Sequence, residues 1–259
     1  MRELSKNPER PALSVVTITY NDPVGLARTL DSLLELYSSS NGQMEVLVQD
    51  GLSSGELGGL QQSYGDWVEF KSEADNGIYD AMNRGLIRTR GSYIWFLNGG
   101  DESTIKQWRD LAELLATDPG SMVLGAYWLD LGLSRVLRLP RRMSYIWHAL
   151  PTSHQAILYP GDCARSTLYD TRYKVAGDYA FTAKMSQRCG VVTTQRPFAT
   201  FRVGGTSYTH AEVIASEASH VQAHILQLGR VPRTISRILH LASRIRRRLL
   251  AKPQPERTS

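Results

Sequence analysis

Long hydrophobic runs and cysteines are both scarce in this chain of 259 residues. The longer apolar runs, such as residues 93–97, fall far short of the roughly 20 residues that a helix needs to span a bilayer. Residues 1–11 are too polar for a signal peptide. The two cysteines, Cys163 and Cys189, have neither metal-ligand spacing nor the density of a secreted disulfide framework. These absences predict a cytoplasmic protein without a leader or a transmembrane helix.

Acids are scarce at the C-terminal end of the chain. Residues 230–259 hold nine Lys or Arg against one acid, Glu256. The positive net charge of the chain, +5, therefore comes from this end, and the rest of the chain is acidic overall. Between residues 235 and 249, Ile and Leu recur at helical spacing with Arg in between. This pattern predicts a basic amphipathic helix on an anionic membrane surface. The alternative is a helix packed on the rest of the chain with its arginines in solvent. Nucleic-acid binding is not expected, because the positive charge is confined to one end.

The N-terminal part alternates strand and helix patterns. Apolar, β-branched runs predict strands, and apolar residues at helical spacing predict helices. The expected strands are residues 13–19, 44–49, 67–71 and 92–97, with helices from residue 23, at residues 57–64 and at residues 76–90. This βαβαβαβ order is typical of an α/β protein whose parallel sheet is covered by helices.

The pattern becomes mixed after residue 101. The sequence predicts a helix at 105–116, a hairpin of 122–128 and 134–139, a strand at 154–159, a helix at 179–188, a strand at 191–194 leading to Pro197, and helices at 212–228 and 234–251 separated by Val231 and Pro232. The expected organisation is an N-terminal arm (1–12), one α/β domain (13–210), C-terminal helices with the basic segment (211–252) and a disordered tail (253–259).

The most informative stretch is residues 73–101, where a helix with polar residues at its start is followed by an apolar strand that ends in Asn98-Gly-Gly-Asp101. A carboxylate at the carboxyl end of a buried strand lies where open α/β sheets bind ligands, and glycines let a diphosphate approach the backbone. Polar residues also follow the first two strands, at residues 19–21 and at Asp50. The sequence therefore predicts a nucleotide-sugar site at one edge of the sheet.

Six short blocks, taken in order, resemble glycosyltransferase family 2, with the closest likeness to enzymes of colanic-acid and exopolysaccharide biosynthesis. They are residues 14–21, 50–51, 75–83, 96–101, 154–155 and 178–179. The resemblance implies a GT-A fold, in which a Rossmann-like nucleotide-sugar half (13–101) merges with a smaller mixed acceptor half (102–210) and is followed by a C-terminal helical extension. One departure is plain: the metal-binding Asp-x-Asp of many relatives reads Asn98-Gly-Gly100, which leaves Asp101 as the only carboxylate.

The resemblance assigns roles to two acids. It implies that Asp178 is the base that deprotonates the acceptor hydroxyl; the alternative role for an Asp at a helix start is an N-cap. Asp101 is the expected ligand of Mg²⁺ or Mn²⁺, because hard cations prefer oxygen ligands and bridge to substrate phosphates. His210 would complete the metal shell. The alternative for Asp101 is a solvated turn.

The remaining candidates surround these acids. The expected nucleotide-sugar ligands are Thr19, Tyr20, Asn21, Asp50, Asp75, Asp80, Asn83, Asn98, Gly99 and Gly100. An Asp before Gly, such as Asp50, is equally typical of a simple turn. His154 and Gln155 belong to the acceptor or diphosphate side, although a lone His is usually structural. Gly204 and Gly205 would form a lid over the diphosphate.

These features predict a metal-dependent inverting glycosyltransferase. The donor would be a UDP- or GDP-sugar, with galactose or fucose suggested by the resemblance, and the acceptor a lipid-linked exopolysaccharide repeat unit. Such an acceptor would place the enzyme on the inner face of the plasma membrane, held by its basic helix. Two alternatives stay open. The thinned metal motif suggests a non-catalytic nucleotide-sugar-binding protein, whereas a nucleotidyltransferase would normally have an early glycine-rich basic loop, which residues 20–23 do not provide.

Overall fold

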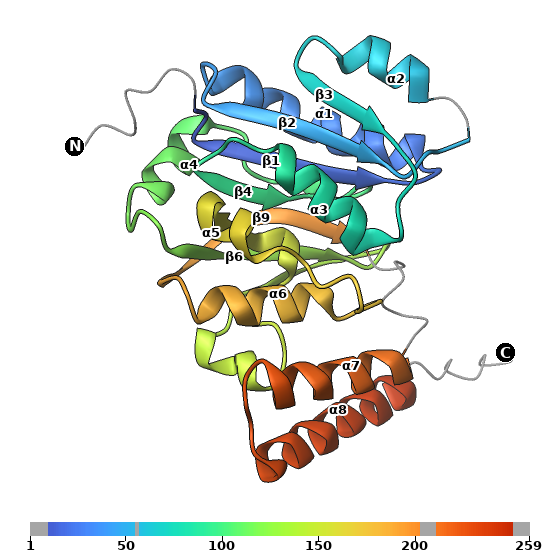
Figure 1. The fold of residues 1–259 in the computed structure, drawn as a ribbon, viewed down its shortest axis with the longest axis vertical. Coiled ribbons are helices and arrows are strands. Elements are labelled where there is room, and N and C mark those ends of the chain that lie inside the picture. The colour runs from blue at the N-terminus through green and yellow to red at the C-terminus, as the bar shows by residue number, and fades with distance from the viewer. Residues whose placement is uncertain (1–9, 55–56, 203–210, 251–259) are drawn as a thin grey trace, which may run out of the picture.

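One mixed β-sheet runs through the molecule, with helices on both of its faces (Figure 1). The computed structural model describes residues 10–54, 57–202 and 211–250. The strand order is β3-β2-β1-β4-β8-β6-β9-β5, and β7 pairs with β6. The strands are β1 (Leu13–Thr19), β2 (Met44–Asp50), β3 (Val68–Ser72), β4 (Tyr93–Phe96), β5 (Glu102–Ser103), β6 (Met122–Asp130), β7 (Arg135–Arg138), β8 (Ile157–Pro160) and β9 (Val191–Arg202).

The N-terminal half of the sheet is parallel, as the sequence predicts. β1 lies between β2 and β4 and is buried along its whole length. Its connections are α1 (Pro23–Ser39), α2 (Leu57–Tyr64) and α3 (Ile78–Arg88). α1 begins where expected because the Asp22 carboxylate accepts the Gly25 N–H at 2.8 Å and Pro23 stands at the first helical position. α3 is shorter than predicted, and its N-cap is Gly77.

The second half is antiparallel where it joins the first. β8 runs antiparallel to β4 and to β6, so the sheet changes from parallel to mixed at β4. The predicted hairpin of β6 and β7 is confirmed. The prediction of a strand ending near Thr194 was wrong, because β9 continues through Pro197 to Arg202. Pro197 lies opposite Ala126 at an irregularity of the β6 to β9 register, a place where a residue without an N–H is tolerated. The strand expected from His154 begins at Ile157, after the 3₁₀ turn η2 (His154–Ala156).

Two apolar layers hold the helices on the sheet. On one face α3, α5 (Gly161–Thr167) and α6 (Gly177–Ser186) pack on residues such as Val16 and Phe96. On the other face α1 and α4 (Trp108–Leu115) pack on residues such as Val15 and Trp95. The sequence pattern missed α5 and β5, which are short. The two faces therefore offer separate environments for binding sites.

Two antiparallel helices close the described chain and lie beyond α6, at the end of the molecule opposite α2 (Figure 1). They are α7 (Ala211–His224) and α8 (Arg230–Leu250). The sequence placed Val231 and Pro232 between the helices, but both lie in the first turn of α8, where a missing N–H costs no intrahelical bond. No helix in the described ranges is both long and apolar enough to cross a membrane. The predicted tail 253–259 and most of the predicted arm lie outside the described residues.

Candidate active site

The carboxyl ends of β1 and β2 meet through hydrogen bonds between their loops. The Asn21 side chain accepts the Ser54 N–H at 3.0 Å, and the Asn21 N–H donates to Ser53 Oγ at 2.7 Å. Asn21 has φ +51°, a left-handed conformation that Asn tolerates. Tyr20 beside it is 66% exposed, so its ring is available to a ligand. This edge of the sheet, with the end of β4, η2 and the start of α6, is called the strand-end site below.

Asp50 is buried and already satisfied within the chain. Its carboxylate accepts the Ser53 N–H at 2.9 Å and the Ser72 hydroxyl at 2.6 Å, and only 2% of the residue is exposed. These bonds fix the loops after β2 and β3. Recognition of a nucleoside base by Asp50 would replace one of them and stays a prediction, as does the role of Thr19, which is 8% exposed at the end of β1.

The polar residues at the start of α3 also bind the chain itself. Asp75 accepts the Gly77 N–H at 2.8 Å, and Asp80 accepts from Asn76 N at 2.9 Å and from Arg84 Nε at 3.2 Å. Asn83 donates to the Tyr169 carbonyl at 2.9 Å and accepts the Tyr169 N–H at 2.7 Å. Both ends of its amide are therefore occupied. Asn83 ties α3 to the segment that leads into α6, and its predicted contact with the donor stays untested.

The Asn98-Gly-Gly-Asp101 turn is held by a buried threonine, Thr29, which no sequence motif marks. Thr29, in α1, donates to the Asp101 carbonyl at 2.7 Å and accepts the Gly100 N–H at 2.9 Å. Gly100 has φ +95°, which favours glycine, whereas Gly99 donates its N–H to the Ile18 carbonyl at 3.0 Å. The turn is thus fixed to both α1 and β1.

Two adjacent residues of η2 connect the two candidate acids. Gln155 Nε2 donates to Asp101 Oδ2 at 2.9 Å. The His154 ring lies with Nδ1 3.8 Å from Asp178 Oδ2 and Nε2 3.3 Å from Asn98 Nδ2. The acid at the end of β4 and the acid at the start of α6 therefore lie on two sides of one dipeptide. The sequence predicted these residue types for one site, and the structure brings them together.

Burial changes the ionisation of all three groups. It raises the pKa of Asp178 to about 6 and that of Asp101 to about 7, and it lowers the pKa of His154 to about 4. His154 is therefore neutral near pH 7 and does not form a full ion pair with Asp178. Among the described residues no Lys or Arg forms a salt bridge with Asp178. A carboxylate whose pKa is raised toward neutrality is a stronger base than an ordinary Asp.

Asp178 is not the N-cap of α6. The N-cap is Ala176, and Asp178 is the second residue of the helix, with its side chain 25% exposed. Gly177 before it lies so close to α3 that a Cβ would stand 2.6 Å from the Tyr79 ring. Only glycine permits this approach. The acid is therefore held beside α3 by close packing and keeps a side that solvent can reach.

Glu217 of α7 fixes the loop before Asp178 and was missed at the sequence level. Its carboxylate accepts three successive backbone N–H groups, from Lys174 at 2.7 Å, Val175 at 3.0 Å and Ala176 at 2.8 Å. Tyr79 Oη donates to the Val175 carbonyl at 2.6 Å. No local pattern marks Glu217, because its partners lie about forty residues away in sequence.

Glu217→Gln is expected to lower kcat by about tenfold with little change in the donor KM, because a looser 174–176 loop misplaces Asp178. The charge of Glu217 adds to burial in raising the pKa of Asp178, so the acid limb of the pH profile should move to lower pH. Glu212→Gln, an exposed acid on the same helix, is the matched control. An unchanged kcat and pH profile in Glu217→Gln would show that the contact is only structural.

The oxygen donors near the turn fit a hard divalent cation. Within the described part of the chain, Asn98 Oδ1 is buried without a hydrogen-bond partner and no Lys or Arg forms a salt bridge with the Asp101 carboxylate. Mg²⁺ and Mn²⁺ accept such oxygens and complete their shell with water and phosphate. No group of three or more His, Cys, Asp or Glu within the described ranges is arranged to hold a metal alone. His210, Gly204 and Gly205 lie outside the described residues.

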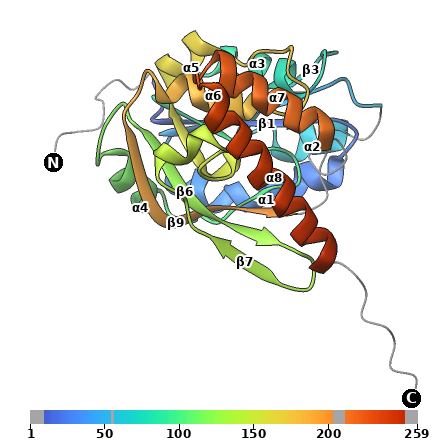
Figure 2. The same cartoon turned by 90° about the horizontal axis from the view of Figure 1, so that it is seen from below.

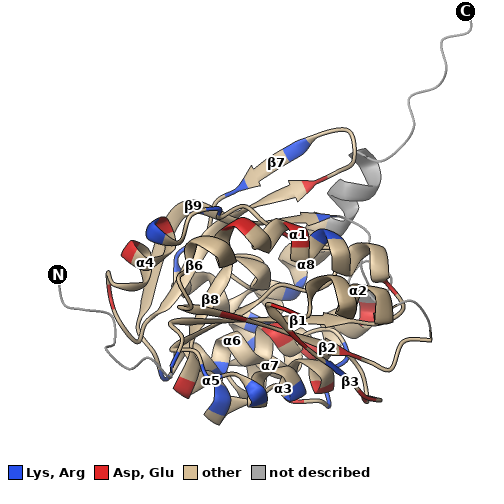
Figure 3. Cartoon of the chain, turned by 90° about the horizontal axis from the view of Figure 1, so that it is seen from above, with Lys and Arg blue, Asp and Glu red and all other residues tan. Residues whose placement is uncertain are grey.

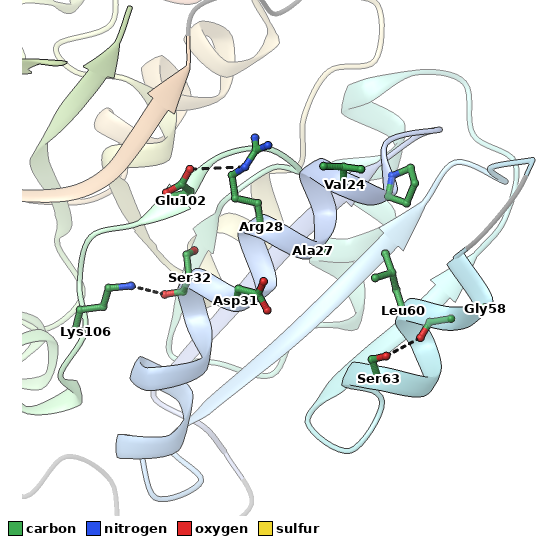
Figure 4. Close-up of a pocket in the computed structure, with 12 residues that line it drawn as sticks. Val24, Ala27, Arg28, Asp31, Ser32, Gly58, Leu60, Ser63, Glu102 and Lys106 are labelled. Carbon is green, nitrogen blue, oxygen red and sulfur yellow. Dashed lines mark hydrogen bonds and ion pairs between the residues drawn. The ribbon is translucent and has the colours of Figure 1, made fainter. Parts of the chain in front are cut away.

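A separate groove of about 1300 Å³ lies between α1 and α2 (Figure 4). Its wall includes Val24, Leu60 and the Arg28 to Glu102 pair, whose nitrogen and oxygen are 3.9 Å apart. α1 covers the sheet face opposite to α3 and α6. The groove is therefore not the space beside Asp178, and no predicted site residue within the described ranges lines it.

The sheet has a parallel half with polar residues at its strand ends and a mixed half that supplies a buried acid at a helix start. This combination is that of a GT-A glycosyltransferase. Residues 14–185 match the family described as Glycosyl transferase family 2, and the chain belongs to that family. The predicted family and fold are thus confirmed.

The relatives and the structural neighbours agree with this assignment. An uncharacterized glycosyltransferase of Mycobacterium tuberculosis is 28% identical over 215 residues, covering 78% of this chain and 79% of its own. A PGL/p-HBAD biosynthesis glycosyltransferase of Mycobacterium bovis is 26% identical over 202 residues, covering 71% and 73%. The finer likeness to colanic-acid enzymes stays a prediction.

Solved structures share the fold at low identity. Residues 1–349 of Staphylococcus aureus TarS in complex with UDP give a TM-score of 0.61 at 16% identity, over 83% of this chain and 70% of that one. The mannosyltransferase PcManGT of Pyrobaculum calidifontis, in complex with GDP-Man and Mn²⁺, gives 0.63 at 15% identity, over 96% and 78%. At this identity the likeness concerns the fold.

Proposed function

We propose that the protein is an inverting glycosyltransferase that moves a sugar from a nucleoside diphosphate to a hydroxyl of a lipid-linked saccharide. The observation that carries this proposal is the pair His154 and Gln155, which contacts Asp178 on one side and Asp101 on the other. Asp178 would act on the acceptor. Asp101 and Asn98 would lie beside the leaving diphosphate.

In the proposed reaction the Asp178 carboxylate takes the proton of the acceptor hydroxyl. The hydroxyl oxygen then forms a bond to the anomeric carbon as the bond from that carbon to the diphosphate oxygen breaks, and its electron pair leaves on the diphosphate. Attack opposite to the leaving group inverts the anomeric configuration. Neutral His154 would hold the Asp178 carboxylate in position without neutralising it.

Asn98 and Asp101 would hold Mg²⁺ or Mn²⁺, which supplies positive charge to the leaving diphosphate. A structural neighbour was solved with Mn²⁺ and GDP-Man, and another with UDP. These ligands support a nucleoside-diphosphate sugar as the donor class for this chain. Galactose and fucose remain the sugars suggested by the sequence resemblance.

The C-terminal helices support a lipid-linked acceptor. α8 carries five Arg between residues 237 and 248 and no acid in its 21 residues. A helix of this composition is attracted to anionic lipids, and an acceptor on a polyprenyl diphosphate would lie in the same membrane. We therefore place the enzyme on the inner face of the plasma membrane, next to a lipid-linked exopolysaccharide unit.

The direct test is a transfer assay. Purified protein is incubated with a panel of UDP- and GDP-sugars, Mn²⁺ and a short lipid-linked acceptor, and products are read by mass spectrometry. We expect one donor to be transferred and its nucleoside diphosphate to be released. If a donor binds but is neither transferred nor hydrolysed, the proposal is replaced by its alternative, a non-catalytic nucleotide-sugar-binding protein. The loss of the first Asp of the Asp-x-Asp motif suggests this alternative.

The pH dependence of kcat/KM should follow the ionisation of Asp178. Only the ionised carboxylate accepts a proton, and burial raises its pKa to about 6. The rate should therefore be level above this pH and fall by about tenfold for each pH unit below it. A pH series with saturating Mn²⁺ measures this limb. A rate that stays level down to pH 4 would remove Asp178 as the base.

A further inference from the structure

α8 is docked on the rest of the molecule by polar side chains. Ser236 is 1% exposed and lies 2.8 Å from both His148 Nδ1 and Gln222 Nε2. His240 stacks on His148 with ring centroids 4.1 Å apart. Arg237 donates to Ser219 Oγ at 2.8 Å. The inward face of this amphipathic helix is thus its polar face.

Between residues 230 and 243, the apolar face of α8 points to solvent. Its exposed apolar side chains are Val231 at 70%, Ile235 at 46%, Ile238 at 60%, Leu239 at 45% and Leu241 at 58%. Water-soluble helices normally bury such a stripe. An exposed apolar stripe of this size marks a docking surface.

The hairpin of β6 and β7 carries a second exposed apolar set. Leu131 is 50% exposed, Leu133 at the turn is fully exposed, and Leu137 and Leu139 are 39% and 52% exposed. The segment 131–142 also contains four arginines and no acid. Figure 3 shows arginine positions along β7, and Figure 2 shows the hairpin projecting from the body on the side toward which α8 runs.

The two elements are linked through η1 (Met143–Trp147), which follows the hairpin directly. Arg141 lies over the Tyr145 ring at 4.1 Å, and His148 after η1 is the residue on which α8 docks through Ser236. The segment that contains η1 therefore connects the leucine-rich hairpin to the place where α8 docks.

We propose that the β6–β7 hairpin is a second membrane-binding element, which inserts Leu133 and its neighbouring leucines into an anionic bilayer while α8 lies on the same bilayer. This proposal rests on the proposed function, in which the acceptor lies in a membrane. It identifies the surface of the protein that contacts this membrane. The proposed occupant is an anionic bilayer, because it offers an acyl layer to the exposed leucines and phosphate headgroups to the arginines beside them. Asp130, just before Leu131, pairs with Arg135 at 3.7 Å, and Arg138, Arg141 and Arg142 add further positive charge beside the leucines. Leucines among this excess of arginines match anionic lipid headgroups above an acyl layer.

The test is sedimentation of the full chain with vesicles of phosphatidylcholine alone or mixed with phosphatidylglycerol. Leu133→Glu should weaken binding to the anionic vesicles by about tenfold, because it replaces an inserted apolar side chain with a carboxylate that the anionic headgroups repel. Ile87→Glu, a change at a 63% exposed residue of α3, is the matched control and should bind as the wild type does. Equal binding by Leu133→Glu and wild type would overturn the proposal, as would equal wild-type binding to both vesicle types.

Two further readouts separate this surface from the proposed function. Leu133→Glu should keep its melting temperature and its transfer to a water-soluble acceptor fragment, since Leu133 is fully exposed. If neither the wild type nor a variant transfers sugar but vesicle binding still depends on Leu133, the proposed function fails and the membrane-binding hairpin is retained. If Leu133→Glu instead dissociates a dimer in solution and leaves vesicle binding unchanged, the hairpin is an interface between copies and the proposal is wrong.

Discussion

Asp178→Asn is expected to lower kcat by ~10²–10⁴-fold, because the amide cannot accept the acceptor proton. The substitution preserves size, and the Asn oxygen can still accept the Tyr179 N–H that Asp178 Oδ1 accepts at 2.7 Å, so the fold should be unaffected. Donor affinity, measured by calorimetry with the nucleoside diphosphate and Mn²⁺, should stay within about twofold of wild type. The acid limb of the remaining activity should disappear.

The matched control is Asp66→Asn, which removes an exposed carboxylate after α2. It should behave as the wild type in both assays. If Asp178→Asn keeps more than a tenth of the wild-type kcat, another group must take the proton, and the assignment of the base is wrong.

Removal of divalent cations is expected to lower transfer by on the order of 10²-fold or more, because the leaving diphosphate then develops charge without compensation. Addition of Mn²⁺ should restore it. In Asp101→Asn, Mn²⁺ should restore less of the activity, since the substitution removes the carboxylate at the turn. The new amide oxygen can still accept the hydrogen bond from Gln155.

Glu102→Gln is the control for the metal prediction. Glu102 follows Asp101 directly but pairs with Arg28 on the α1 side of the sheet, so its response to chelator and Mn²⁺ should be that of the wild type. Full activity in chelator would reassign Asp101 to a structural role, with its hydrogen bond to Gln155 orienting η2.

The parallel half of the fold could be predicted because its signals are local. Buried parallel strands are continuous apolar runs, and β1 occupies the predicted residues 13–19. β5 has two residues, too few to form a pattern, and β9 carries Pro197 in its interior because a bulge opposite Ala126 accepts it. Pro232 was read as a break between helices, although the first turn of a helix tolerates it.

The site could be predicted in its residue types but not in its contacts. The motifs indicated Asp101, His154, Gln155 and Asp178, whereas the hydrogen bond from Gln155 to Asp101 depends on β8 pairing with β4. Thr29 and Glu217 support the site from helices far away in sequence, and no spacing marks them. Several predicted donor ligands, Asn83 among them, already bind the chain itself.

The central claim is that donor and acceptor meet at the strand-end site between Asp101 and Asp178. A crystal structure with a nucleoside-diphosphate sugar and Mn²⁺ tests it most directly. The account predicts the diphosphate and the metal beside Asn98 and Asp101, with the anomeric carbon facing the Asp178 carboxylate. A nucleotide bound in the groove between α1 and α2, or a sugar turned away from Asp178, would contradict it.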